Sequence, residues 1–148
     1  DWLNASSLID AVDKNAPLGL MEKHTFLRVG AVSKAKNGDP AKSAELYERF
    51  LSLGVQIRKS ECQGCHAAGT VPPNQVSDLK KSDLGLEYWR QLKAAGALDN
   101  TRKQLRKEWK RKPADARLNL LLYHLEQHSG RTNAAAAHSK ALGALTAN

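Results

Sequence analysis

The chain contains few aromatic and β-branched residues and no long apolar run. Aromatic residues make up 5% of its 148 positions, and alanine and leucine are common. Residues that favour strands are therefore scarce, and the composition predicts an all-α protein. No apolar stretch approaches the roughly 20 residues with which a helix crosses a bilayer, so we expect no membrane span.

Cysteine is equally scarce, and both cysteines stand in one short motif that reads CQGCH over residues 62–66. C-x-x-C-H is the attachment signature of c-type haem: the two thiols bond to the haem vinyl groups, and the histidine ligates the iron. In a helix, Cys62, Cys65 and His66 would stand at i, i+3 and i+4 and leave one face together. The motif predicts one covalently attached haem c, with His66 as the proximal ligand.

Other uses of these two cysteines are less well supported by the sequence. A structural zinc site needs four ligands, and the chain lacks a second cysteine pair. A thioredoxin-like redox pair stands at the start of a helix in a βαβ setting, which a helical sequence does not offer. A disulfide that closes so short a loop would stabilise little.

The motif has a wider context that resembles class I c-type cytochromes. Residues 38–47 (GDPAKSAELY) precede the motif at 62–66, and a proline pair follows at 72–73. In that family a helix that begins near Gly-Asp and carries Leu-Tyr leads into C-x-x-C-H, and prolines follow. The resemblance implies electron transfer and a periplasmic location, because haem is attached covalently outside the bacterial cytoplasm or in organelles. A chain that begins at Asp1 would then be the mature form of an exported protein.

The resemblance stops at two departures from the family pattern. The segment between Tyr47 and Cys62 is several residues longer than usual, and no methionine follows His66, so the family's distal ligand has no counterpart. Met21 is the only thioether, and it would raise the reduction potential as a distal ligand, although core packing is its ordinary role. A bis-histidine haem would instead use one of the other histidines, which are His24, His124, His128 and His138. A lysine, an asparagine, water or a vacant distal position also remain open. His124 and His128 stand at i and i+4 on one expected helix, and we expect this pair at surface or half-buried positions rather than in a metal site.

The helical periodicity predicts a single domain of about five to seven helices around the haem. Residues 1–37 form N-terminal helices, residues 38–75 the haem-attachment segment, and residues 76–148 a basic helix and a helical hairpin. We expect Asp39 and Pro40 to open a helix that ends near Gly54. We also expect Pro113 to take the first position of a new helix, and Gly130 to end that helix.

Two pairs of expected helices, residues 39–54 and 114–145, are similar to those of tetratricopeptide repeats. Most signature positions of that repeat are not matched. We therefore expect ordinary helix pairing rather than a repeat array.

The formal net charge is +8, and much of the excess lies in one segment. Leu98, Leu105 and Trp109 form a narrow apolar stripe beneath a basic surface. The basic residues are Arg102, Lys103, Arg106, Lys107, Lys110, Arg111, Lys112 and Arg117. Such charge runs are commonly solvated faces, but this one could also steer an acidic redox partner. Trp2, Trp89 and Trp109 are expected to serve in packing.

Together these features predict a periplasmic monohaem c-type cytochrome that transfers one electron between redox proteins. It is not an enzyme on this interpretation, and it binds no nucleic acid. The alternatives are a haem-based gas-binding or sensing module with an open distal site, and a haem subunit of a larger redox complex.

Overall fold

The computed structural model describes residues 2–15, 20–65, 80–81 and 83–146, and it describes side chains for residues 4–12, 22–55, 80–81 and 83–145. Within these residues the chain is all α-helical, without strands, which confirms the predicted fold class. The helices are α1 (Trp2–Asn15), α2 (Leu20–Lys36), α3 (Pro40–Cys65), α5 (Asp83–Ala94), α6 (Leu98–Arg111), α7 (Ala116–His128) and α8 (Thr132–Thr146).

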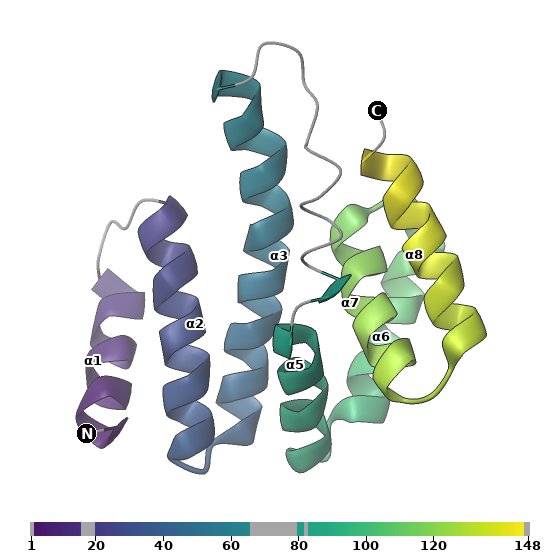
Figure 1. Ribbon diagram of the computed structural model, residues 1–148. Coiled ribbons are helices and arrows are strands. Elements are labelled where there is room, and N and C mark those ends of the chain that lie inside the picture. Colours follow the sequence, from purple (N-terminus) through teal and green to yellow (C-terminus); the bar gives the residue numbers. More distant parts are fainter. Residues whose placement is uncertain (1, 16–19, 66–79, 82, 147–148) are drawn as a thin grey trace.

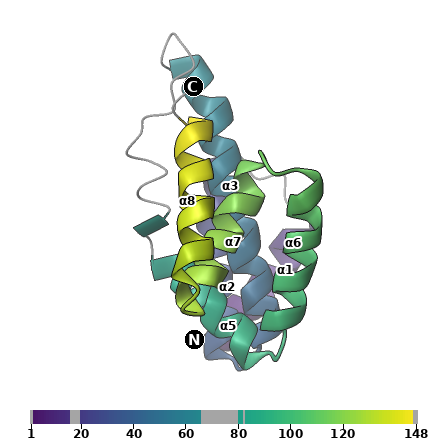
Figure 2. The same ribbon diagram turned by 90° about the vertical axis from the view of Figure 1, so that its right-hand side faces the viewer.

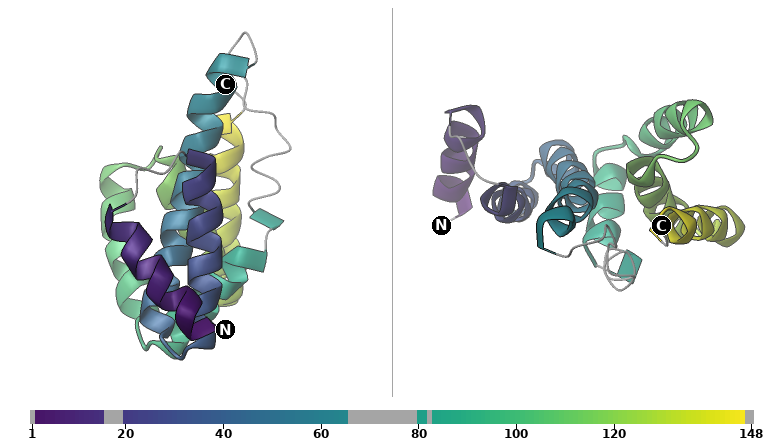
Figure 3. Two further views of the ribbon diagram at one scale, coloured as in Figure 1. Left: turned by 90° about the vertical axis from the view of Figure 1, so that its left-hand side faces the viewer. Right: turned by 90° about the horizontal axis from the view of Figure 1, so that it is seen from above.

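The helices form a row of antiparallel neighbours (Figure 1). Seen from above, α1 lies at one edge and packs on α2, followed by α3 and α5, while α6, α7 and α8 group at the other edge (Figure 3). The closest pairs are α2 with α3, α7 with α8, and α3 with α5. Each helix therefore packs mainly on the helices next to it in the chain.

The apolar core is centred on α3 and α7. Leu46 and Leu51 of α3 and Leu121 and Leu125 of α7 are completely buried. Leu27 of α2 joins the same apolar cluster. These side chains stand on the apolar faces that the helical periodicity predicts, and their burial is the main source of stability for so polar a sequence.

Three turns between helices have the same structure. Gly38, Gly96 and Gly130 have φ values of 76°, 68° and 77°, and each stands two residues after the last residue of a helix. Each glycine N–H donates to the carbonyl three residues earlier, and the next N–H donates to the carbonyl five residues before itself, at 2.9 Å in all three turns. These are Schellman terminations, in which glycine supplies the left-handed conformation.

The repeated turns divide the chain into three helical hairpins: α2 with α3, α5 with α6, and α7 with α8. Gly96 and Gly130 are 34 residues apart, which equals the period of tetratricopeptide repeats. Gly38 and Gly96 are 58 apart, 24 more than one period. The second interval does not match this period, so the described turns do not establish a repeat array. The extra residues lie between the first two hairpins, in the part of the chain that includes the CQGCH motif.

Two predicted helix boundaries are wrong. α3 does not end near Gly54 but continues to Cys65. Gly54 is buried within the helix, and it is not among the glycines with positive φ, so it does not terminate α3. α7 begins at Ala116 rather than at Pro113, because Asp115 provides the N-cap and accepts a hydrogen bond from the Leu118 N–H at 2.9 Å.

Candidate functional site

The two cysteines lie at the end of the longest helix. α3 extends beyond its neighbours in Figure 1 and Figure 2, and Cys62 and Cys65 belong to its last turn. The helical spacing assumed for the haem motif therefore holds for the backbone of both cysteines. Their side chains, His66 and the prolines at 72–73 lie outside the described parts of the chain.

The described core contacts of α3 lie well below the cysteines. The α3 side chains of the apolar cluster run from Ala44 to Val55. Cys65 stands ten residues beyond Val55, about 15 Å further along the helix. Among the described side chains, the apolar core contacts of α3 therefore end about 15 Å short of Cys65.

His24 packs near the middle of α3. Its ring stacks on Phe50, with 3.9 Å between ring centroids and 16° between ring planes. Because Phe50 precedes Cys62 by twelve residues, His24 lies about 18 Å below that cysteine along α3. Met21 is in the first turn of α2, about one turn nearer the cysteine end, and its side chain is outside the described ones.

The other histidines lie in the second half of the chain. His128 is half-buried as expected, but His124 is completely buried, so the prediction of a surface or half-buried position is wrong for His124. The reason is a close approach of α5, whose Gly85 has no side chain and makes room for the His124 ring. Burial, aided by the charge of Arg90, lowers the pKa of His128.

His138 belongs to a buried polar cluster around Asn119. The Asn119 Nδ2 atom donates to the carbonyls of Pro113 and Asp115, both at 2.8 Å. Its Oδ1 atom accepts from the Trp109 Nε1–H at 3.2 Å and lies 2.9 Å from the His138 Nδ1. Since Oδ1 can only accept, the proton of neutral His138 is on Nδ1.

The pKa of His138 is lowered. Burial is the main cause and the charge of Arg106 adds to it, although Glu126 acts in the opposite direction. Trp109 packs edge-on to the His138 ring. The cluster therefore joins α6, α7 and α8, and burial within it favours the neutral imidazole of His138.

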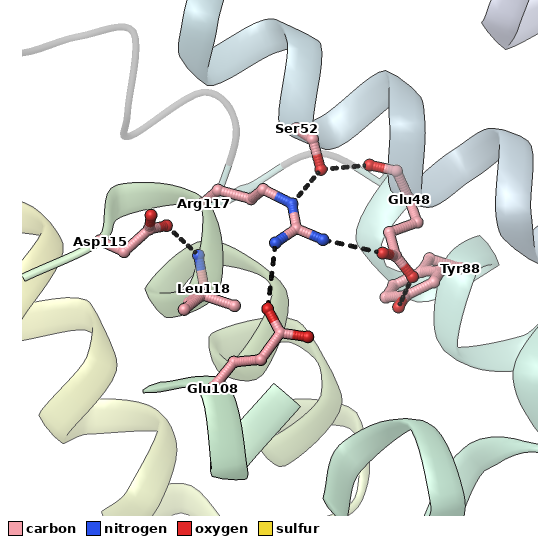
Figure 4. Close-up of polar contacts among 7 residues, drawn as sticks. All are labelled: Glu48, Ser52, Tyr88, Glu108, Asp115, Arg117 and Leu118. Atoms are coloured by element: carbon pink, nitrogen blue, oxygen red, sulfur yellow. Dashed lines mark hydrogen bonds and ion pairs between the residues drawn. The ribbon is translucent and has the colours of Figure 1, made fainter. Parts of the chain in front are cut away.

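A second polar cluster joins α3, α5, α6 and α7 (Figure 4). Arg117 donates to the Glu48 carboxylate and to the Ser52 hydroxyl, both at 3.1 Å, and lies 3.8 Å from Glu108. The buried Tyr88 hydroxyl donates to Glu48 at 2.9 Å. Burial, and then the Glu48 charge, raise the pKa of Tyr88 well above its usual value. No sequence motif predicts this cluster, because its members come from four different helices.

A buried carboxylate lies where α6, α7 and the turn between α7 and α8 meet. The Glu126 side chain is completely buried and forms ion pairs with Arg106 at 3.3 Å and Arg131 at 3.8 Å. Both arginine side chains remain about half exposed. An unpaired buried charge would be costly, and the ion pairs with the two arginines offset the cost of burying this carboxylate.

The basic helix has the predicted apolar stripe. Leu105 is buried, while Leu98 and Trp109 are partly buried against the core. Three of the basic residues named above are neutralised by ion pairs, namely Arg102, Arg106 and Arg117. The other five make no ion pair with the described residues, and all five are exposed: Lys103, Lys107, Lys110, Arg111 and Lys112. We call these five residues the α6 basic face.

The described residues contain no cluster of three or more histidine, cysteine, aspartate or glutamate side chains that could hold a metal ion. Among the helices described, none is both long and apolar enough to span a membrane. Comparison with protein-family models, with curated proteins and with solved structures finds no match to this chain.

Proposed function

We propose that the chain is a monohaem c-type cytochrome of the periplasm that transfers one electron between redox proteins. The observation that carries the proposal is that the only two cysteines form a C-x-x-C-H motif, and both belong to one helical turn. Cys62 and Cys65 would hold the haem by thioether bonds, and His66 would ligate the iron. The haem, once bound, supplies the one-electron chemistry.

The direct test is covalent haem attachment. The chain is exported to a bacterial periplasm together with a cytochrome c maturation system, purified, denatured and examined for haem that stays with the polypeptide. We expect one haem per chain in the wild type, and loss of covalent haem in Cys62→Ala/Cys65→Ala. His66→Ala should alter the iron coordination spectrum. A wild-type chain that folds without covalent haem would refute the proposal.

The α6 basic face supports an acidic redox partner. Five exposed cations, four of them on α6 and Lys112 directly after it, raise the local positive potential and would accelerate encounters with an acidic protein. We expect the electron-transfer rate to an acidic acceptor to fall steeply with salt. Replacing Lys103 and Lys107 by glutamine should weaken that salt dependence without a change in the haem spectrum.

A haem-binding module with an open distal site is the second candidate. Two observations favour it: no methionine follows His66, and His124 and His138 are packed within the core. Carbon monoxide separates the two functions, because it binds ferrous haem only where the distal position is vacant or weakly held. An unchanged low-spin spectrum favours the electron carrier, and Met21→Ala then tests that residue as the distal ligand.

A further inference from the structure

A cavity of about 610 Å³ lies between α1 and α2. Both helices line it with residues at the spacing i, i+3, i+4 and i+7, which marks one face of each helix. The lining residues are Ala5, Leu8, Ile9 and Val12 of α1, and Glu22, Thr25, Phe26 and Val29 of α2. We call these eight residues the α1–α2 face. Six of them are apolar, so the wall of the cavity is mainly apolar.

Two apolar side chains at this cavity are exposed. Leu8 is 65% exposed and Val29 is 47% exposed. Among the described residues, the other large apolar side chain that is exposed is Leu145 of α8, at 37%. Scattered exposed apolar residues are normal on a protein surface, whereas apolar residues gathered beside a hollow are typical of an interaction surface. Leu8 and Val29 therefore mark the α1–α2 face as a candidate for protein contact.

The α1–α2 face lies at the end of the row of helices. α1 stands at one edge and packs on α2, which in turn packs on α3 (Figure 3). α1 approaches α2 closely at Gly30, where a Cβ atom would lie 3.2 Å from Ile9. Lys34 of α2 also pairs with Asp10 of α1 at 2.6 Å. These contacts hold the two helices together, so the face is formed before any partner arrives.

The charge of the chain is divided unevenly between this end and the rest. Residues 1–37 contain five lysines and arginines against four aspartates and glutamates, a formal net charge of +1. Residues 38–148 contain 18 against 11, a formal net charge of +7. Like charges repel, so two copies of the chain approach each other at the lowest electrostatic cost when their N-terminal ends meet.

We infer that the α1–α2 face binds a second copy of this chain, so that two such faces pack together in a homodimer. A twofold interface requires a surface that is complementary to itself. Leu8 and Val29 supply the exposed apolar side chains, and the cavity between α1 and α2 supplies space that those of the other copy can fill. The near-neutral charge of residues 1–37 favours this end over the strongly basic remainder of the chain.

The size of the face sets the expected strength of the dimer. α1 has 14 residues and is about 21 Å long, and two packed helices are roughly 20 Å wide, which gives roughly 400 Å² of flat contact per copy. Stable interfaces of standard size bury about 800 Å² per partner. We therefore expect a weak, reversible dimer with a Kd on the order of 10–100 µM.

The test is sedimentation equilibrium of the purified full chain from roughly 1 µM to 1 mM, a range that brackets the expected Kd. We expect the mean mass to rise with concentration from that of one chain towards that of two. The mass of a single chain at millimolar concentration would overturn the inference, even if the cavity then bound an apolar dye. Growth beyond two chains would contradict a closed twofold contact.

Matched serine variants locate the contact. Leu8→Ser removes an exposed apolar side chain from the α1–α2 face, and Leu145→Ser makes the same change on α8. In a twofold dimer each substitution acts twice, so Leu8→Ser should raise the Kd by about tenfold or more. Leu145→Ser should leave it within about twofold. Equal weakening by the two variants would refute the α1–α2 face, and circular dichroism checks that both variants are folded.

Salt gives an independent reading of the same contact. Each copy carries a formal charge of +8, so added salt screens the repulsion between copies and should lower the Kd of the dimer. A contact between the α6 basic face of one copy and acidic groups of another would instead weaken as salt rises. A dimer that dissociates steeply with salt would therefore contradict the inference.

Haem dependence separates this inference from the proposed cytochrome function. Cys62→Ser/Cys65→Ser removes covalent haem and should leave the Kd of the dimer within about twofold of wild type. Loss of the dimer together with the haem would contradict the α1–α2 face as an independent site. A dimer formed by a chain that never acquires haem would support the face and refute only the cytochrome.

Discussion

Replacing Gly85 by alanine is a sharp test of the packing between α5 and α7. A Cβ atom at Gly85 would overlap the His124 ring, which is completely buried and cannot swing into solvent. Alanine in a helix normally gains about 0.5–1 kcal/mol over glycine. Forcing extra volume into a packed core typically costs about 1–3 kcal/mol. We therefore expect net destabilisation, of about 1–2 kcal/mol.

Two other glycines provide an internal scale for the same substitution. A Cβ at Gly143 of α8 meets no atom within 4 Å, so Gly143→Ala should stabilise the protein by the helix gain alone. A Cβ at Gly30 would lie 3.2 Å from side-chain carbons of Ile9 and Leu46, so its effect should fall between the other two. The gain in helix propensity is the same for all three glycine-to-alanine substitutions, and only the space around the new Cβ atom differs.

Urea unfolding followed by circular dichroism measures the free energy of unfolding of each of the three variants. For a chain of this size a change of 1 kcal/mol moves Tm by roughly 2–4 °C, so thermal melts give a second reading. The double variant Gly85→Ala/His124→Ala should be more stable than the sum of the single effects, because removal of the ring relieves the overlap. If Gly85→Ala proves as stabilising as Gly143→Ala, the assigned packing of α5 on α7 is wrong.

Three further predictions concern buried polar groups and turns. Glu126→Gln removes the charge that pairs with Arg106 and Arg131, and we expect it to destabilise the protein by about 1–3 kcal/mol at low salt, measured by urea unfolding. Glu126→Leu should cost less than Glu126→Gln only if the ion pairs contribute little. The lowered pKa of His138 means that the unfolded chain binds the proton more readily, so stability should be complete above about pH 6.5 and fall below it; His138→Gln should flatten this dependence. Gly130→Ala places a side chain at φ 77° and should lower stability by about 1 kcal/mol, whereas an unchanged melt would contradict the turn geometry.

Much of the helical framework could be predicted from local sequence. The glycines at 38 and 130 follow apolar helical patterns, and Asp39 caps α3 by accepting from the Lys42 N–H at 3.0 Å. Such signals act within one helical turn and need no partner from elsewhere in the chain. The apolar stripe of the basic helix was predictable for the same reason, because helical periodicity alone sets it.

Features that depend on distant contacts could not be predicted. Gly54 resembles a helix stop in the sequence, but it lies buried within α3, and the helix continues past it. The burial of His124 requires the approach of Gly85 from another hairpin. Lys23, Arg49 and Arg117 come from three helices and line one cavity of about 250 Å³, and only the packing of α2, α3 and α7 brings them together.

The sequence by itself determines the chemistry available at residues 62–66, because C-x-x-C-H is a local motif whose spacing suits one helical turn. It also determines the helical class and the positions of the glycine turns. Only the tertiary structure decides that the two cysteines stand at the end of a helix whose described core contacts end near Val55. The physical reason is that helix length past a buried segment, and the side chains gathered around a cavity, depend on contacts between residues far apart in the chain.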